Sequence, residues 1–174
     1  MIKKMRFKVE PASYGEMGHL EFFDNGTALK VDLSEKTLSL KSGEIINITA
    51  TASSEHGAGW EAIQCFNTTG APAHSGTCWC SATGSGEKCW LEIEFESAIP
   101  KHFANKLTFC CGQGHGSFSG TYTLFFIDEN GGSEQIGQPL YVDAHNGIFE
   151  WVNLVRCFVG KDGLYYFLRP EAAI

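Results

Sequence analysis

Residues 91–96 read Leu-Glu-Ile-Glu-Phe-Glu and alternate strictly between apolar and acidic side chains. Successive side chains of a β-strand point to opposite faces of a sheet, so this pattern predicts a strand with one buried and one solvated face. Residues 121–126 and 107–111 also place apolar side chains at every second position. The three segments together predict an all-β fold.

Turn signals separate these apolar segments. Asn25-Gly26 lies between two apolar runs and predicts a hairpin, because this dipeptide accepts positive φ. Residues 130–132 and 161–163 indicate further turns, and the second of these leads into a closing strand over 164–168. No segment has a sustained helical period, although residues 57–63 would allow one short turn. We therefore expect a single-domain β-sandwich, of the jelly-roll type.

The composition limits the classes of partner. A chain of 174 residues fits one domain, and 43% hydrophobic with 19% charged residues is typical of an ordered globular protein. The formal net charge of −7 disfavours nucleic acid or an anionic membrane surface as a partner. No stretch is long and apolar enough to span a bilayer, so we expect no membrane insertion.

The seven cysteines are an odd number and cannot all pair within the chain. Several lie in apolar segments, where a free cysteine behaves as a small buried hydrophobe. The N-terminus is basic, but no apolar run follows it, so it does not read as a signal peptide. We expect reduced thiols and an intracellular or virion location. A secreted protein whose signal was removed is the alternative.

Four motifs follow one another in an order that resembles the discoidin (coagulation-factor C-type) β-sandwich, within the galactose-binding-domain-like group. They lie at residues 62–67, 77–81, 90–95 and 122–131. The resemblance covers about residues 45–168. It implies a jelly roll that binds ligands through loops at one end and rarely catalyses. We therefore assign residues 45–174 to this sandwich and residues 1–44 to an N-terminal β-hairpin extension packed on it.

The same resemblance implies a candidate calcium site. Asn67 stands where the family has an aspartate, and Thr69 and Glu171 would supply a hydroxyl and a distal carboxylate. Calcium takes six to eight oxygen ligands and prefers carboxylates, so the neutral Asn67 weakens such a site. The alternative is a turn held only by its own hydrogen bonds, with no cofactor.

Two loops combine aromatic and polar residues as a sugar site requires. Residues 53–60 contain Glu55, His56 and Trp60 between serines and glycines. The glycine-rich residues 112–120 contain His115 and Phe118. For the second loop, a long flexible hairpin connection explains the pattern equally well.

The sequence does not predict an enzyme. Cys78, Cys80 and Cys89 with His74 would suit zinc chemically, but their spacing is unlike that of structural zinc sites, and packing explains them better. The sequence signatures of metalloproteases, serine hydrolases, nucleotide-binding loops and dinucleotide folds are absent.

Two functions remain open. The first is a structural or attachment subunit of a larger assembly, such as a virion capsid or tail component, with other protein subunits as partners. The second is a glycan-binding module whose end loops bind surface glycans. The lack of a signal peptide and the unpaired cysteines favour the first function, and the aromatic loop favours the second.

Overall fold

The computed structural model describes residues 1–70, 76–111, 119–143 and 148–152, with the backbone of two further strands at 157–159 and 165–167. One sheet contains β1 (Ile2–Pro11), β4 (Val31–Asp32), β5 (Thr37–Ser39), β6 (Ile45–Ala52), β8 (Cys89–Ile99), β10 (Gly120–Ile127) and β11 (Ser133–Val142). The other contains β2 (Glu16–Asp24), β3 (Thr27–Ala28), β7 (Trp79–Cys80), β9 (Lys106–Cys110) and β12 (Phe149–Val152).

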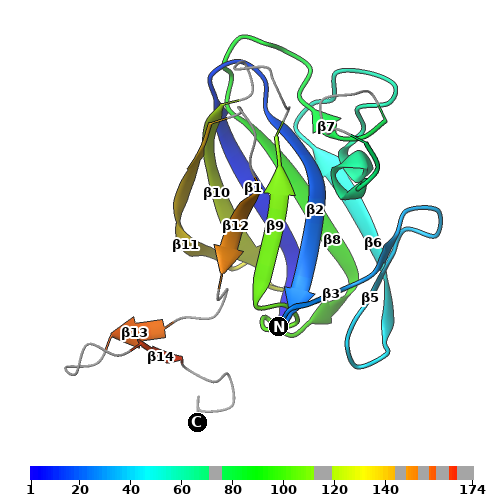
Figure 1. Ribbon diagram of the computed structural model, residues 1–174, viewed down its shortest axis with the longest axis vertical. Helices are drawn as coiled ribbons and strands as arrows, with labels where there is room; N and C mark the ends of the chain where they lie inside the picture. Colours follow the sequence, from blue (N-terminus) through cyan, green and yellow to red (C-terminus); the bar gives the residue numbers. More distant parts are fainter. Residues whose placement is uncertain (71–75, 112–118, 144–147, 153–156, 160–164, 168–174) are drawn as a thin grey trace.

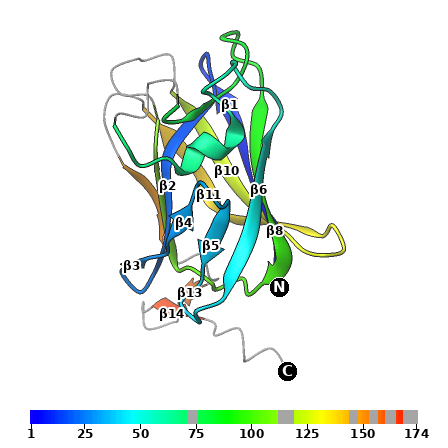
Figure 2. The ribbon, with the colours of Figure 1, turned by 90° about the vertical axis from the view of Figure 1, so that its right-hand side faces the viewer.

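The two sheets pack face to face (Figure 1). The seven-stranded sheet has the order β11-β10-β1-β8-β6-β5-β4, and the second sheet has the order β12-β9-β2-β3 with β7 paired to β2. All described strand pairs are antiparallel. This confirms the expected all-β, two-sheet sandwich. A short 3-10 helix, η1 (Ala62–Phe66), contacts β2 and β6 and lies between these two strands (Figure 2).

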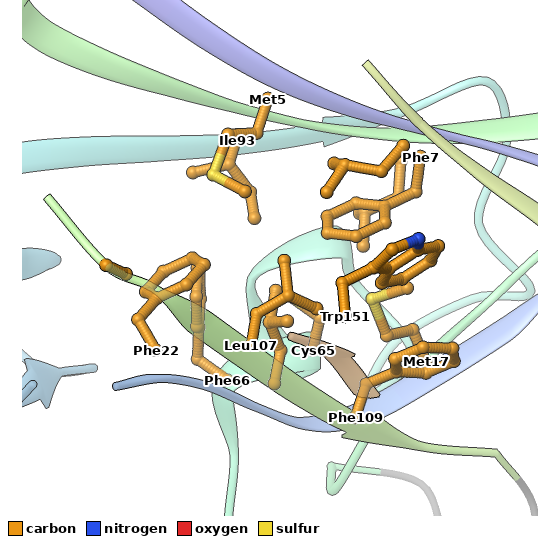
Figure 3. Packing of buried hydrophobic residues seen from close by; sticks show 14 of the residues in the cluster. Met5, Phe7, Met17, Phe22, Cys65, Phe66, Ile93, Leu107, Phe109 and Trp151 are labelled. Carbon is orange, nitrogen blue, oxygen red and sulfur yellow. The ribbon is translucent and has the colours of Figure 1, made fainter. Parts of the chain in front are cut away.

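The core lies between the sheets and follows from the alternation in the sequence. On β8, Leu91, Ile93 and Phe95 are fully buried, and the predicted rows on β9 and β10 are buried in the same way. Aromatic side chains fill one half of the core, where Trp151 stacks on Phe109 with ring centroids 5.6 Å apart (Figure 3). Burying such a row removes large apolar areas from water, at about 25 cal/mol per Å².

The glutamates that alternate with the buried residues of β8 lie on the outer face of the seven-stranded sheet, where Glu92 and Glu94 pair with cations of β1. Arg6 lies directly opposite Glu92, and Lys4 lies opposite Glu94. The Arg6 Nε donates to Glu92 at 2.7 Å, and the Lys4 Nζ donates to the same carboxylate at 2.9 Å. Glu92 is therefore buried beneath two cations rather than solvated, and hydrogen bonds to Glu92 and Glu94 raise the pKa of Lys4. Opposite charges directly across two strands stabilise their pairing.

The first predicted turn has the expected geometry. Asn25 and Gly26 have φ values of 49° and 83°, so both central residues are left-handed, as a tight hairpin between β2 and β3 requires. At the second predicted turn, residues 130–132, Gly131 has φ of 83°. The Asp128 carboxylate accepts hydrogen bonds from the backbone N–H groups of Asn130 and Gly132. The expected turn at 161–163 lies outside the described residues.

The structure differs from the expected N-terminal extension. β1 is in the middle of the seven-stranded sheet, between β10 and β8, and β2 belongs to the second sheet. Residues 1–44 thus contribute strands to both layers and are not an addition to a sandwich that starts at residue 45. The physical reason is the alternation of Met5, Phe7 and Val9, which are fully buried while the intervening cations face outward.

The C-terminal strands β13 (Cys157–Val159) and β14 (Tyr165–Phe167) form a two-stranded sheet of their own. Figure 1 shows this hairpin outside the two packed sheets. Within the described part of the chain, no helix is long and apolar enough to cross a lipid bilayer.

Candidate functional site

An aromatic row lies at the end of the sandwich where β1 connects to β2. His56 packs edge-on against Tyr14 with ring centroids 5.6 Å apart and against Trp60 with centroids 5.9 Å apart. His56 is exposed, while Tyr14 and Trp60 are half-buried. Three rings in succession, one of them an indole, present an apolar surface with polar edges, which suits the face of a sugar ring.

Hydrogen bonds hold the loop that carries this row. The His56 N–H donates to the Cys80 carbonyl at 2.9 Å, and the Ala82 N–H donates to the Ser54 hydroxyl at 3.1 Å. The indole N–H of the buried Trp79 donates to the Ser54 carbonyl at 3.0 Å. The loop is therefore fixed to β7, and the aromatic row is positioned before any ligand arrives.

Two carboxylates, Glu55 and Glu61, accept hydrogen bonds from the backbone of this segment. Glu55 accepts from the backbone N–H of Ala62 at 2.8 Å, at the start of η1. Glu61 accepts from the N–H of Gly59 at 3.0 Å, and backbone hydrogen bonds hold its pKa below the usual value. Of the predicted residues in this loop, the structure brings His56 and Trp60 together and directs Glu55 toward the backbone.

Tyr14 was not predicted and comes from the loop between β1 and β2. Gly84, in the loop before β8, faces its ring so closely that an added Cβ would lie 2.5 Å from a ring carbon. Three separate loops thus converge on the aromatic row. The Ser-Tyr-Gly sequence at 13–15 marks a turn, but nothing in it indicates that Tyr14 meets His56.

The other predicted binding residues, His115 and Phe118, lie outside the described residues. The described residue that follows their loop, Ser119, accepts a backbone hydrogen bond from Ala12 at 2.7 Å. Since Ala12 precedes Tyr14 by two residues, this loop ends near the aromatic row.

The predicted calcium turn is held by internal hydrogen bonds. The Asn67 Oδ1 accepts from the backbone N–H of Thr69 at 3.0 Å and from its hydroxyl at 2.6 Å. The Asn67 amide also donates to Gln64 at 3.2 Å. Glu171, the expected distal ligand, lies outside the described residues. Among the residues that are described, no three His, Cys, Asp or Glu side chains are grouped so that they could hold a metal ion.

A buried carboxyl group lies beneath this end of the sandwich. Glu16 is directly opposite Cys80 in the β2–β7 pair and is fully buried. Within the described residues, neither of its carboxyl oxygens has a hydrogen-bond partner. Burial raises the pKa of Glu16 to about 8, and the nearby Cys78 thiol offsets only part of that effect. The group is therefore largely protonated at neutral pH.

The backbone of Glu16 belongs to a well-ordered hydrogen-bond network. The Tyr122 hydroxyl donates to the Glu16 carbonyl at 2.6 Å, and the Cys111 thiol donates to that carbonyl at 3.2 Å. Burial raises the pKa of Cys80 to about 12 and also raises the pKa values of Cys78 and Cys111. Thiols of this kind remain protonated and are poor nucleophiles.

The two neighbouring edge strands on one side of the sandwich carry exposed apolar residues, called here the apolar edge: Tyr141 on β11, Ile148 immediately before β12 and Val152 on β12. Their side chains are 66%, 71% and 53% exposed. The two edge strands lie beside each other, since the Trp151 indole donates to the Gln138 carbonyl at 3.4 Å. Exposed apolar residues on two neighbouring edge strands make this region a candidate interaction surface.

Comparison with known proteins finds no matching family model, no matching curated protein and no matching solved structure. The function is therefore inferred from the geometry alone.

Proposed function

We propose that this protein is a non-catalytic β-sandwich that acts as a structural or attachment subunit of a larger assembly, such as a virion capsid or tail component. The observation that carries the proposal is the apolar edge at Tyr141, Ile148 and Val152. A partner subunit that covers this edge would remove apolar surface from water, which is the main favourable term in protein association.

The cysteines support an intracellular or virion location. All six described cysteines are free and buried. Proteins that fold in oxidising compartments usually pair such residues, whereas reducing compartments keep them as thiols.

Size-exclusion chromatography with light scattering tests the proposal. We expect a mass above the 19.1 kDa of one chain, rising with protein concentration. A mass of one chain at every concentration, together with specific binding of a glycan, would contradict it.

The second candidate function is glycan binding at the aromatic row. The specific observation that favours it is the succession of Tyr14, His56 and Trp60 on a hydrogen-bonded loop. A glycan array tests this function, with Trp60→Ala as the disabling variant. Trp90→Ala is the matched control, because Trp90 is also half-buried but lies beneath Arg6 on a different face. We expect Trp60→Ala alone to weaken binding, by about tenfold for the loss of one stacking ring.

The finer fold type is also part of the proposal. We propose that the sandwich is a discoidin-like jelly roll, supported by the order of the motifs at 77–81, 90–95 and 122–131. An experimental structure of the chain, compared strand by strand with that family, tests it.

A further inference from the structure

The main paths of the two packed sheets end at four strands, and all of these except β12 are poorly suited to pairing with another strand. β7, beside β2, has only two residues. β3 and β4 each end a sheet with only two residues. β11 is longer, but its pairing with β10 shifts register between Tyr122 and Leu124, and Gly137 and Pro139 lie in the irregular part. Very short strands, bulges and prolines are the devices by which proteins protect sheet edges from unwanted pairing.

β12 has fewer of these devices, although with four residues it is itself short. Its four residues pair with β9 without a register shift and contain no proline. Within the described residues, its other side has no strand partner. Its one charged residue, Glu150, pairs with Lys106 at 3.9 Å, so its charge is partly compensated. Ile148, immediately before the strand, and Val152, its last residue, are exposed. Within the described residues, the β12 edge is therefore open and carries two exposed apolar residues beside one charged residue.

The C-terminal strands β13 and β14 form a two-stranded sheet that, in the described part of the chain, lacks a third strand to pair with. Among the residues that the structure describes, β13 and β14 pair only with each other, with Cys157 opposite Phe167 and Val159 opposite Tyr165. All six residues of the two strands are of apolar or aromatic type. An isolated two-stranded hairpin is at best marginally stable in water, and a third strand or a packed layer is needed to stabilise it.

We infer that the β12 edge binds the β13–β14 hairpin of a second copy of this chain. This inference rests on the proposed assembly function and names the partner. The hairpin supplies the strand that the β12 edge lacks, and the edge supplies the sheet that the hairpin lacks. Figure 1 shows the hairpin beyond the end of the sandwich rather than alongside its own β12, which is the arrangement that exchange between two copies needs.

Two substitutions disable the two halves of this contact separately. Val152→Lys places a charge on the β12 edge, and Val159→Pro removes a backbone donor from the hairpin. Ile45→Lys is the matched control, because Ile45 is 68% exposed and lies on β6 in the other sheet. We expect each of the first two variants to raise the dissociation constant of self-association at least tenfold, and we expect the control to leave it unchanged. Near-ultraviolet circular dichroism verifies that each variant keeps the native core.

Mixing the two disabled variants is the decisive experiment. Neither variant alone has a working contact, but the hairpin of Val152→Lys can bind the intact edge of Val159→Pro. Light scattering of the mixture should therefore recover association, at a level between that of the variants and that of the unmodified chain. If Val159→Pro associates normally by itself, the edges pair with each other and the inference is wrong. If the unmodified chain associates and neither variant weakens it, the inference fails while the assembly function stands. A chain that stays monomeric at every concentration overturns both.

Discussion

The buried Glu16 carboxyl group makes the stability of this protein depend on pH in a predictable direction. Its pKa is about 8 in the folded protein against an ordinary value of 4.5. Between these two values the folded state holds one proton more than the unfolded chain, so the free energy of unfolding falls as pH rises. The fall is about 1.4 kcal/mol per pH unit, or roughly 3 kcal/mol from pH 5 to pH 7.

Glu16→Gln removes the titration while keeping a neutral side chain of the same shape. We expect the variant to lose this part of the pH dependence, so that its stability relative to the unmodified protein rises by roughly 3 kcal/mol between pH 5 and pH 7. Urea unfolding followed by tryptophan fluorescence, at half-unit pH steps, measures the difference. Any other group whose protonation changes on unfolding contributes to both proteins and cancels in the comparison.

The matched control is Glu129→Gln, at an exposed position in the turn between β10 and β11. It should leave the pH dependence unchanged. If the stability difference between Glu16→Gln and the unmodified protein stays constant from pH 5 to pH 8, Glu16 is not a buried, protonated carboxyl group. The structural description of the β2–β7 pair would then need revision.

Two further predictions concern the calcium turn and the cysteines. Asn67→Ala should lower the free energy of unfolding by about 1 kcal/mol, the usual contribution of such hydrogen bonds, and equally with EDTA or with added calcium. A melting temperature of the unmodified chain that drops with EDTA would instead indicate a bound ion. The six buried thiols should react with a thiol reagent only as fast as the protein unfolds, whereas the denatured chain should show all seven thiols at once. Rapid labelling of several thiols in the native protein would contradict their burial.

The sequence predicted those parts of the fold that local chemistry decides. Alternation on β8 and β10 identified the buried faces, because a strand has only two faces and a core covers one of them. Asn25-Gly26 identified a turn because few residue pairs accept two left-handed conformations. The same alternation is present at Met5, Phe7 and Val9, so the inclusion of β1 in the sandwich was readable from the sequence. The three lysines and the arginine of β1, however, make the same segment resemble a basic terminus.

The parts that the sequence could not predict depend on contacts between distant segments. Tyr14 and His56 are separated by more than forty residues, and nothing local to either residue indicates that they meet. Glu16 is followed by a methionine and a glycine and resembles any exposed acidic residue until β7 covers it. Likewise, nothing in the sequence of β12 shows that it lies at the edge of its sheet, because that position depends on the order of all the strands. Candidate sites that draw on several loops therefore needed the structure.

Hydrogen–deuterium exchange at β12 would distinguish most directly between a sandwich built for assembly and one that functions alone. The relevant amides are those of Phe149–Val152 that do not pair with β9, which in an antiparallel ladder belong to every second residue. If the chain assembles through this edge, these amides should be protected at high protein concentration and should exchange rapidly on dilution, while core amides on β1 stay protected throughout. Rapid exchange of the β12 amides at every concentration would mean that nothing covers the edge, and the proposal of an assembly subunit built on it would be wrong.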